Sequence, residues 1–290
     1  MTDAAADKAR ELKLRIASAL VIAPVALAIT WAGGIAFSVM IVAGAVLMAD
    51  EWTTIVCGAS RAPGRLAVLG LVGLAVAASA FGHRLGMAPT TTTGIVVIGL
   101  GLAAALAMRE ARLSGLGEPA TGWTPWGAFY AGLPCIALDG LRAAPQGLAL
   151  VIFLFAVVWS TDIAAYFTGR ALGGPKLWPA VSPKKTWSGA LGGLAAAALA
   201  GTAVAHVAGA AKLWPVLLVA AALSVASQAG DLFESSLKRK FGVKDSGRLI
   251  PGHGGILDRV DGLVAAAVLA MLIGTLNGGI ATAGRGLIGW

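Results

Sequence analysis

The stretch GLALVIFLFAVVWSTDIAAY, residues 147–166, is the most informative part of this sequence about its architecture. It has no charged residue before Asp162, and it matches the roughly 20 apolar residues that a helix needs to cross a bilayer. The whole chain has the same character: of its 290 residues, 58% are hydrophobic and 12% are charged, against about 25% charged in soluble domains. This composition excludes intrinsic disorder, and the unbroken apolar runs exclude an outer-membrane β-barrel, whose strands alternate.

The chain contains further apolar stretches of similar length on both sides of this one. The stretch at 126–141 is ambiguous, because it contains Pro134 and ends near Asp139. The sequence therefore predicts an all-α, polytopic integral membrane protein with about nine transmembrane helices. These are expected at 16–32, 35–49, 66–82, 94–108, 126–141, 147–166, 189–209, 213–230 and 263–280.

The distribution of basic residues favours nine spans over eight. Lys and Arg accumulate in the short cytoplasmic loops of membrane proteins. With nine spans, 18 of the 22 Lys and Arg lie on the same side as the N-terminus, which is therefore predicted to be cytoplasmic. The N-terminal half, 1–145, then holds an interfacial N-terminal segment and spans one to five. The half at 146–290 holds spans six to nine and the cytoplasmic loops 167–188 and 231–262.

The polar residues of the first half do not suggest a site. Asp50 and Glu51 end the second span, where we interpret them as a solvated helix end. Cys57 and Cys135 lie in apolar surroundings and are interpreted as buried small apolar residues rather than as a disulfide. The chemistry is therefore expected in the second half.

The first polar segment of the second half begins at Asp162, at the cytoplasmic end of an apolar helix. An ionisable side chain in such a place usually faces the protein interior or a watery cavity. The run SPKKT at 182–186 brings Lys184 and Lys185 directly before a predicted helix. A helix N-terminus adds N–H groups and partial positive charge, so this run suits a phosphate; an anchor to lipid headgroups is the alternative.

The second polar segment, 230–262, combines acids from two predicted helices. The helix that leaves the membrane carries polar residues at i, i+3, i+4 and i+7, all on one face: Asp231, Glu234, Ser235 and Lys238. The next helix carries Asp258 and Asp261 at i and i+3. Because the loop returns the chain to the same membrane face, these carboxylates can converge. Oxygen ligands without clustered His or Cys favour Mg²⁺.

Basic residues surround these acids, as a metal-bound polyphosphate requires: acids hold the metal and bases hold the phosphate oxygens that it leaves uncovered. The glycines at 252, 254 and 255 would let the backbone approach a ligand, and His253 between them could bind phosphate or transfer a proton. A solvated, salt-bridged loop is the alternative. The chain contains no P-loop or dinucleotide-binding fingerprint, and its basic residues lie too close to the bilayer to suggest DNA or RNA.

The order S-L-K-R-(x4)-K-D-(x5)-P-G-H-G-G-I-L-D-R-V-D at 236–261 resembles the signature of the phosphatidate cytidylyltransferase (CDP-diacylglycerol synthase) family. The segments 162–170, 182–186 and 230–235 are similar to further motifs of that family. One departure is Ser188, where the family commonly has Glu, so the role of that carboxylate is not assigned to this position. The resemblance covers about the last 130 residues, whereas the first half matches only as generic spans.

The resemblance implies that CTP and phosphatidate react to give CDP-diacylglycerol and pyrophosphate at the cytoplasmic face of the inner (plasma) membrane. Asp231, Asp258 and Asp261 are then expected to hold one or more Mg²⁺ ions, with Lys238 as a further catalytic residue. The expected substrate-binding residues are Lys184, Lys185, Arg239, Lys244, Arg259, His253, Ser235 and Asp162.

Beyond the two substrates, we expect contact with membrane lipids and no nucleic-acid partner. The spacing of Gly274 and Gly278 allows close helix packing and gives weak support for a homodimer. Two other functions stay open. A CTP-dependent lipid or polyprenol kinase would attack the γ-phosphorus, and a transporter would place polar groups at mid-bilayer within inverted repeats.

Overall fold

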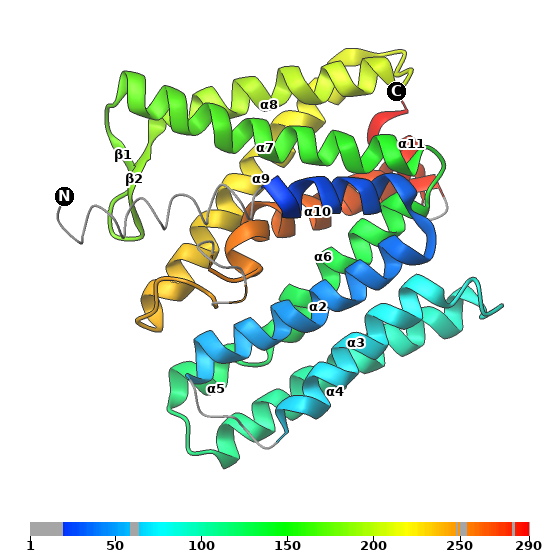
Figure 1. Cartoon of the computed structure of the whole chain (residues 1–290), viewed down its shortest axis with the longest axis vertical. Helices are drawn as coiled ribbons and strands as arrows, with labels where there is room; N and C mark the ends of the chain where they lie inside the picture. Colours follow the sequence, from blue (N-terminus) through cyan, green and yellow to red (C-terminus); the bar gives the residue numbers. More distant parts are fainter. Residues whose placement is uncertain (1–19, 59–63, 248, 250–253, 280–281, 290) are drawn as a thin grey trace. The chain divides into compact units, whose positions relative to one another are not determined.

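The computed structural model describes residues 20–58, 64–247, 249, 254–279 and 282–289, and most of them are helical (Figure 1). A first helix covers Leu20–Ala32. The others are α2 (Gly34–Cys57), α3 (Arg65–Phe81), α4 (Pro89–Leu113), α5 (Glu118–Trp123), α6 (Trp126–Ala143), α7 (Gly147–Leu172), α8 (Trp187–Val207), α9 (Leu213–Lys240), α10 (Leu257–Gly278) and α11 (Ala283–Ile288). The strands β1 (Lys176–Trp178) and β2 (Ser182–Thr186) pair antiparallel between α7 and α8.

The helices confirm a polytopic, all-α membrane protein. Six of those described are long and apolar enough to cross a membrane, namely α2, α4, α7, α8, α9 and α10. The other three predicted spans correspond to the shorter apolar helices Leu20–Ala32 and α3 and to α6. Large apolar side chains are exposed on these helices, for example Leu66 of α3 (82% exposed) and Leu276 of α10 (75% exposed). Contact with lipid tails is favourable for such side chains. The predicted interfacial segment before residue 16 lies outside the described residues.

The chain forms two compact units, which are described separately. The first comprises Met1–Gly132 and Phe241–Val260, and the second comprises Leu133–Lys240 and Asp261–Trp290. This grouping does not coincide with the predicted division at residue 145. One reason is that the chain after α9 returns to α2, where Glu51 accepts hydrogen bonds from it.

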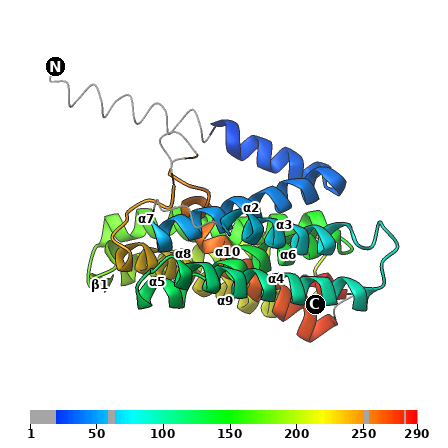
Figure 2. The same ribbon diagram turned by 90° about the horizontal axis from the view of Figure 1, so that it is seen from below.

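In the first unit, α3 packs against both α2 and α4, and α3 and α4 lie side by side in both overall views (Figures 1 and 2). Trp52 of α2 is fully buried, and its indole Nε1 donates to the Trp123 carbonyl oxygen at 3.1 Å. Asp50 instead forms an ion pair with Arg65 of α3, at 2.6 Å. The last turns of α2 are thus held from two sides, and Glu51 between these residues is buried.

In the second unit, α7 and α8 run side by side and α9 packs against both (Figure 1). The hairpin β1–β2 joins α7 to α8, and β2 leads directly into α8. Thr186 is the N-cap of α8: its hydroxyl accepts from the Gly189 N–H at 3.1 Å. Gly274 and Gly278 of α10 lie against α11 of the same chain. They are therefore already used in an intrachain contact, and the homodimer stays a prediction without their support.

We expect Gly193→Ala to lower the apparent melting temperature in detergent, because a methyl group there would lie 2.7 Å from the Thr161 carbonyl oxygen of α7. Overpacking of this kind costs about 1–3 kcal/mol. The matched control is Gly101→Ala in α4, where the new methyl group meets no described atom within 4 Å. Gly101→Ala is expected to keep or raise the melting temperature, since alanine favours helix. Equal melting temperatures for the two variants would contradict the close α7–α8 contact.

Candidate active site

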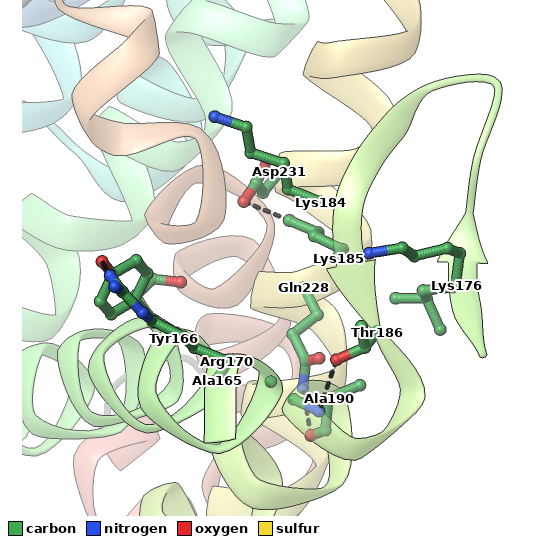
Figure 3. A pocket seen from close by; sticks show the side chains of 14 residues that line it. Ala165, Tyr166, Arg170, Lys176, Lys184, Lys185, Thr186, Ala190, Gln228 and Asp231 are labelled. Carbon is green, nitrogen blue, oxygen red and sulfur yellow. Dashed lines mark hydrogen bonds and ion pairs between the residues drawn. The ribbon is translucent and has the colours of Figure 1, made fainter. Parts of the chain in front are cut away.

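The second unit contains a cavity of about 610 Å³ where α7, the hairpin, α8 and α9 meet (Figure 3). It lies beside the end of α7 that carries Asp162 and beside the start of α8. Its polar lining residues are Asp162, Tyr166, Arg170, Lys176, Lys184, Lys185, Thr186, Gln228 and Asp231. Four of these are cationic and two are carboxylates, so the cavity suits an anion larger than a single carboxylate.

An ion pair between Lys185 and Asp231 joins the hairpin to α9 at this cavity (Figure 3). Lys185 is the penultimate residue of β2, directly before the Thr186 cap of α8, so the strand and the cap together fix where it leaves the backbone. The other carboxylate oxygen of Asp231 accepts from the Ser235 hydroxyl at 3.3 Å, one helical turn further along α9. The predicted i, i+4 relation of these two residues is therefore confirmed.

Two further carboxylates, from other helices, lie within electrostatic range of Asp231. They are Asp162 of α7 and Asp261 of α10. Asp261 also accepts a hydrogen bond from its neighbouring Gly262 N–H at 2.8 Å. Sequence reasoning placed Asp162 among the substrate-binding residues, whereas its position beside Asp231 makes it equally suited to a cation.

These acids provide oxygen donors of the type that Mg²⁺ prefers. Within the described residues, no three Asp, Glu, His or Cys side chains stand at ligand spacing. Magnesium in nucleotide sites usually keeps several waters and uses one or two carboxylates together with substrate phosphates, so the donor set fits without a three-carboxylate cage. The ammonium group of Lys185 now lies where a cation would meet Asp231.

Another cationic group, on α7, lies across the cavity from the hairpin (Figure 3). The Arg170 guanidinium donates to the Tyr166 hydroxyl at 3.0 Å, one turn apart on α7. Both residues face the cavity across from Lys176 of the hairpin (Figure 3). Basic groups on two sides allow a polyphosphate to be held along its length rather than at one end.

Lys238 lies further along α9 and is nearly buried, at 8% exposure. Its ammonium group lies 3.0 Å from Oε1 of Glu234, which is fully buried. Arg239 follows on the exposed side of the same helix. The direct catalytic role predicted for Lys238 stays a prediction, because its described contact is with Glu234.

The remaining predicted site residues belong to the first unit. Asp258, in the first turn of α10, accepts hydrogen bonds through Oδ2 from the N–H groups of Ser246 and Gly255, at 2.8 and 2.9 Å. Lys244 and Arg259 are exposed. His253 lies outside the described residues. The assignment of Asp258 as a metal ligand stays a prediction.

Sequence reasoning missed three residues that the structure brings into or near these sites. Lys176 could have been suspected, since it shares a short loop with the SPKKT run. Gln228 could also have been suspected, because it is an amide in an apolar helix, three residues before Asp231. Glu51, interpreted above as a solvated helix end, is in fact buried and hydrogen-bonded to residues 246, 256 and 257. Nothing in the local sequence indicated that contact.

Comparison with known proteins shows a family match over most of the chain. A sequence model described as "Cytidylyltransferase family" matches residues 13–276. The chain belongs to the cytidylyltransferase family. The match includes nearly all of the first half of the chain, which the motifs alone did not link to the cytidylyltransferase family.

Individual relatives support the same assignment. The chain is 46% identical over 269 residues to a phosphatidate cytidylyltransferase of Brucella suis biovar 1 (strain 1330), covering 91% of this chain and 94% of the relative. It is 45% identical over the same length to a phosphatidate cytidylyltransferase of Brucella abortus biovar 1 (strain 9-941), with the same coverage. A shorter match, 50% identical over 117 residues, is to a phosphatidate cytidylyltransferase of Staphylococcus haemolyticus (strain JCSC1435) and covers 40% of this chain and 45% of the relative. The family resemblance of 236–261 is therefore confirmed.

Proposed function

We propose that this protein transfers CMP from CTP to phosphatidate, giving CDP-diacylglycerol and pyrophosphate. The names of its close relatives support this substrate pair. The observation that carries the proposal is the Lys185–Asp231 pair inside a basic cavity in a membrane protein. An acid for a metal and several bases for phosphate stand together there.

In the reaction, an oxygen of the lipid phosphate attacks the α-phosphorus of CTP. A new P–O–P bond forms, the bond from the α-phosphorus to the bridging oxygen of the β-phosphate breaks, and pyrophosphate leaves. The attacking phosphate is already ionised near neutral pH, so the protein needs no strong general base. Its main tasks are to align the two substrates and to neutralise their negative charge. We propose that phosphate oxygens are bound by four basic residues that line the cavity, Arg170, Lys176, Lys184 and Lys185.

We propose that Mg²⁺ is held by Asp231, with Asp258 and Asp261 as the further predicted ligands and Asp162 as a candidate beside them. A bound divalent cation would neutralise phosphate charge and orient the triphosphate. With a metal ion at Asp231, the Lys185 ammonium would be released from Oδ2 to pair with substrate phosphate instead. Without substrate, Lys185 and Asp231 would thus pair with each other. With substrate, Asp231 would bind the metal and Lys185 would bind the nucleotide phosphates.

We further propose that the site faces the cytoplasm from the inner (plasma) membrane. The support is the distribution of charge, because 18 of the 22 basic residues fall on one side of a nine-span topology. The cations of the cavity belong to that set. CTP is expected on the cytoplasmic side, which agrees with this orientation.

CTP labelled separately at the α- and γ-phosphorus tests the proposed function. With phosphatidate and Mg²⁺ in detergent, we expect the α-label in the lipid fraction and the γ-label in pyrophosphate. A lipid kinase would instead transfer the γ-label to lipid and release CDP. A transporter would leave both labels in CTP. Either of these two outcomes would overturn the proposal.

A further inference from the structure

Glu51 occupies an unusual position for a residue at the end of a membrane helix. It is 7% exposed and accepts three hydrogen bonds, all from the segment that follows α9 in the sequence. Oε1 accepts from the Ile256 N–H at 2.8 Å, and Oε2 accepts from the Leu257 N–H at 2.8 Å and from the Ser246 hydroxyl at 2.9 Å. A buried carboxylate is costly unless such donors surround it.

The same segment carries Asp258, and the two carboxylates share one partner. The Ser246 hydroxyl lies 2.9 Å from Oε2 of Glu51 and 2.9 Å from Oδ2 of Asp258. The Ser246 and Gly255 N–H groups also donate to Oδ2 of Asp258, at 2.8 and 2.9 Å. Glu51 and Asp258 are therefore linked through a serine, and all the residues concerned belong to the first unit.

The contacts of this turn require glycine at position 255. A methyl group at Gly255 would collide with both the Ser246 hydroxyl and the Glu51 carboxylate. The N–H groups that Glu51 binds open α10, whose first turn contains Asp258. At a helix start these N–H groups have no partner within the helix. A carboxylate that satisfies them from a different helix fixes the direction in which α10 begins, and hence the direction of Asp258.

We propose that Glu51 is a positioning residue for the reaction: it orients the turn that presents Asp258, although it does not itself touch substrate. This inference rests on the proposed function, in which Asp258 serves the metal-bound triphosphate. It assigns the N-terminal half a part in the chemistry, where sequence analysis expected none. Short charge-assisted hydrogen bonds are well suited to this task, because they are stronger and more directional than neutral ones.

The test uses the full-length protein in detergent with the Glu51→Gln variant. Glutamine keeps the size of the side chain but turns an amide N–H₂ toward the backbone N–H groups, so at least one hydrogen bond is lost. We expect kcat to fall by about 10- to 100-fold, the range for a small misplacement of a reacting group, while KM for CTP changes by less than about 3-fold. Asp50→Asn is the matched control, since it removes the neighbouring carboxylate and its ion pair with Arg65 but no contact to this turn. It is expected to keep the wild-type kcat.

Hydrogen exchange provides a readout that does not depend on activity. The amides of Ile256 and Leu257 donate to Glu51, so a peptide covering residues 254–258 is expected to exchange faster in Glu51→Gln and at the wild-type rate in Asp50→Asn. If Glu51→Gln does not fold, Ser246→Ala takes its place. Ser246→Ala removes the shared hydroxyl. We expect it to lower kcat and to lower the protection of residues 254–258 from hydrogen exchange, as Glu51→Gln would. Unchanged exchange together with unchanged kcat in the variant tested would overturn the inference.

A double variant separates positioning from general stabilisation. If Glu51 acts through Asp258, then Glu51→Gln combined with Asp258→Asn is expected to be no more than about 3-fold slower than Asp258→Asn alone. Losses that multiply would overturn the positioning role, as would a fully active Asp258→Asn. These outcomes leave the proposed transfer of CMP intact, although a fully active Asp258→Asn would also remove Asp258 from the proposed metal ligands. The proposed function itself would be overturned by a different result: a wild-type protein that forms no CDP-lipid from CTP and phosphatidate.

Discussion

Replacement of Asp231 by asparagine is expected to reduce CDP-lipid formation by at least about 100-fold, the usual consequence of losing a charge that acts in the transition state. Asp231 pairs with Lys185 at the cavity and lies in electrostatic range of Asp162 and Asp261. Asparagine keeps the shape of the side chain but cannot neutralise a cation. The loss is therefore expected mainly in kcat, measured as transfer of the α-label of CTP to lipid.

Asp50→Asn is again the appropriate control for this variant. It breaks an Asp–Arg ion pair of the same kind, between two helices of the first unit, and neither residue lines the cavity. It should retain at least half of the wild-type rate. Asp231→Glu adds a finer measurement: the charge is kept but displaced, so the Mg²⁺ concentration for half-maximal rate is expected to rise. An Asp231→Asn protein with near-wild-type activity would show that the cavity is not the site of the reaction.

Removal of divalent metal with EDTA is expected to abolish activity, and added Mg²⁺ is expected to restore it. The reason is that CTP and phosphatidate are both anionic, and the cavity's cations alone must otherwise neutralise them. Ca²⁺ should restore the rate poorly, because it is larger and takes six to eight ligands in looser geometry. The measurement is the initial rate of CDP-lipid formation against the concentration of free metal.

The melting temperature in EDTA is the control for metal removal. The described fold is held by helix packing and hydrogen bonds, with Lys185 paired to Asp231, so it should survive without metal. A similar melting temperature with and without EDTA, together with lost activity, would assign the metal to the reaction. Full activity in excess EDTA would rule out the metal-dependent scheme.

Several local features followed directly from the order of the residues. Helical spacing predicted that Ser235 would lie beside Asp231 and that Glu234 and Lys238 would share a face, and both pairs are in contact. The placement of the SPKKT run directly before a helix was also predicted, and α8 begins at Trp187. These contacts involve residues within one or two helical turns, where backbone geometry alone sets the distance.

Other features could not be derived in this way. The Lys185–Asp231 pair joins residues 46 positions apart, and Glu51 meets Leu257 across 206 positions. The hairpin was expected only as a loop, because strands of three and five residues carry little periodicity. The sequence placed Asp258 and Asp261 on one helix face, but the structure groups Asp258 with Glu51 and Asp261 with Asp231.

Hydropathy and charge were sufficient to establish a helical membrane protein, because lipid forces each spanning backbone to satisfy its own hydrogen bonds within a helix. The family motifs were sufficient to indicate the chemistry. Which side chains meet was decided by tertiary packing, because helices in lipid associate through close contact of small residues and through specific polar bonds rather than through a hydrophobic pattern that the sequence displays. For that reason the sequence indicated that Glu51 lies at a solvated helix end, whereas in the folded protein it is buried and hydrogen-bonded to the turn that carries Asp258.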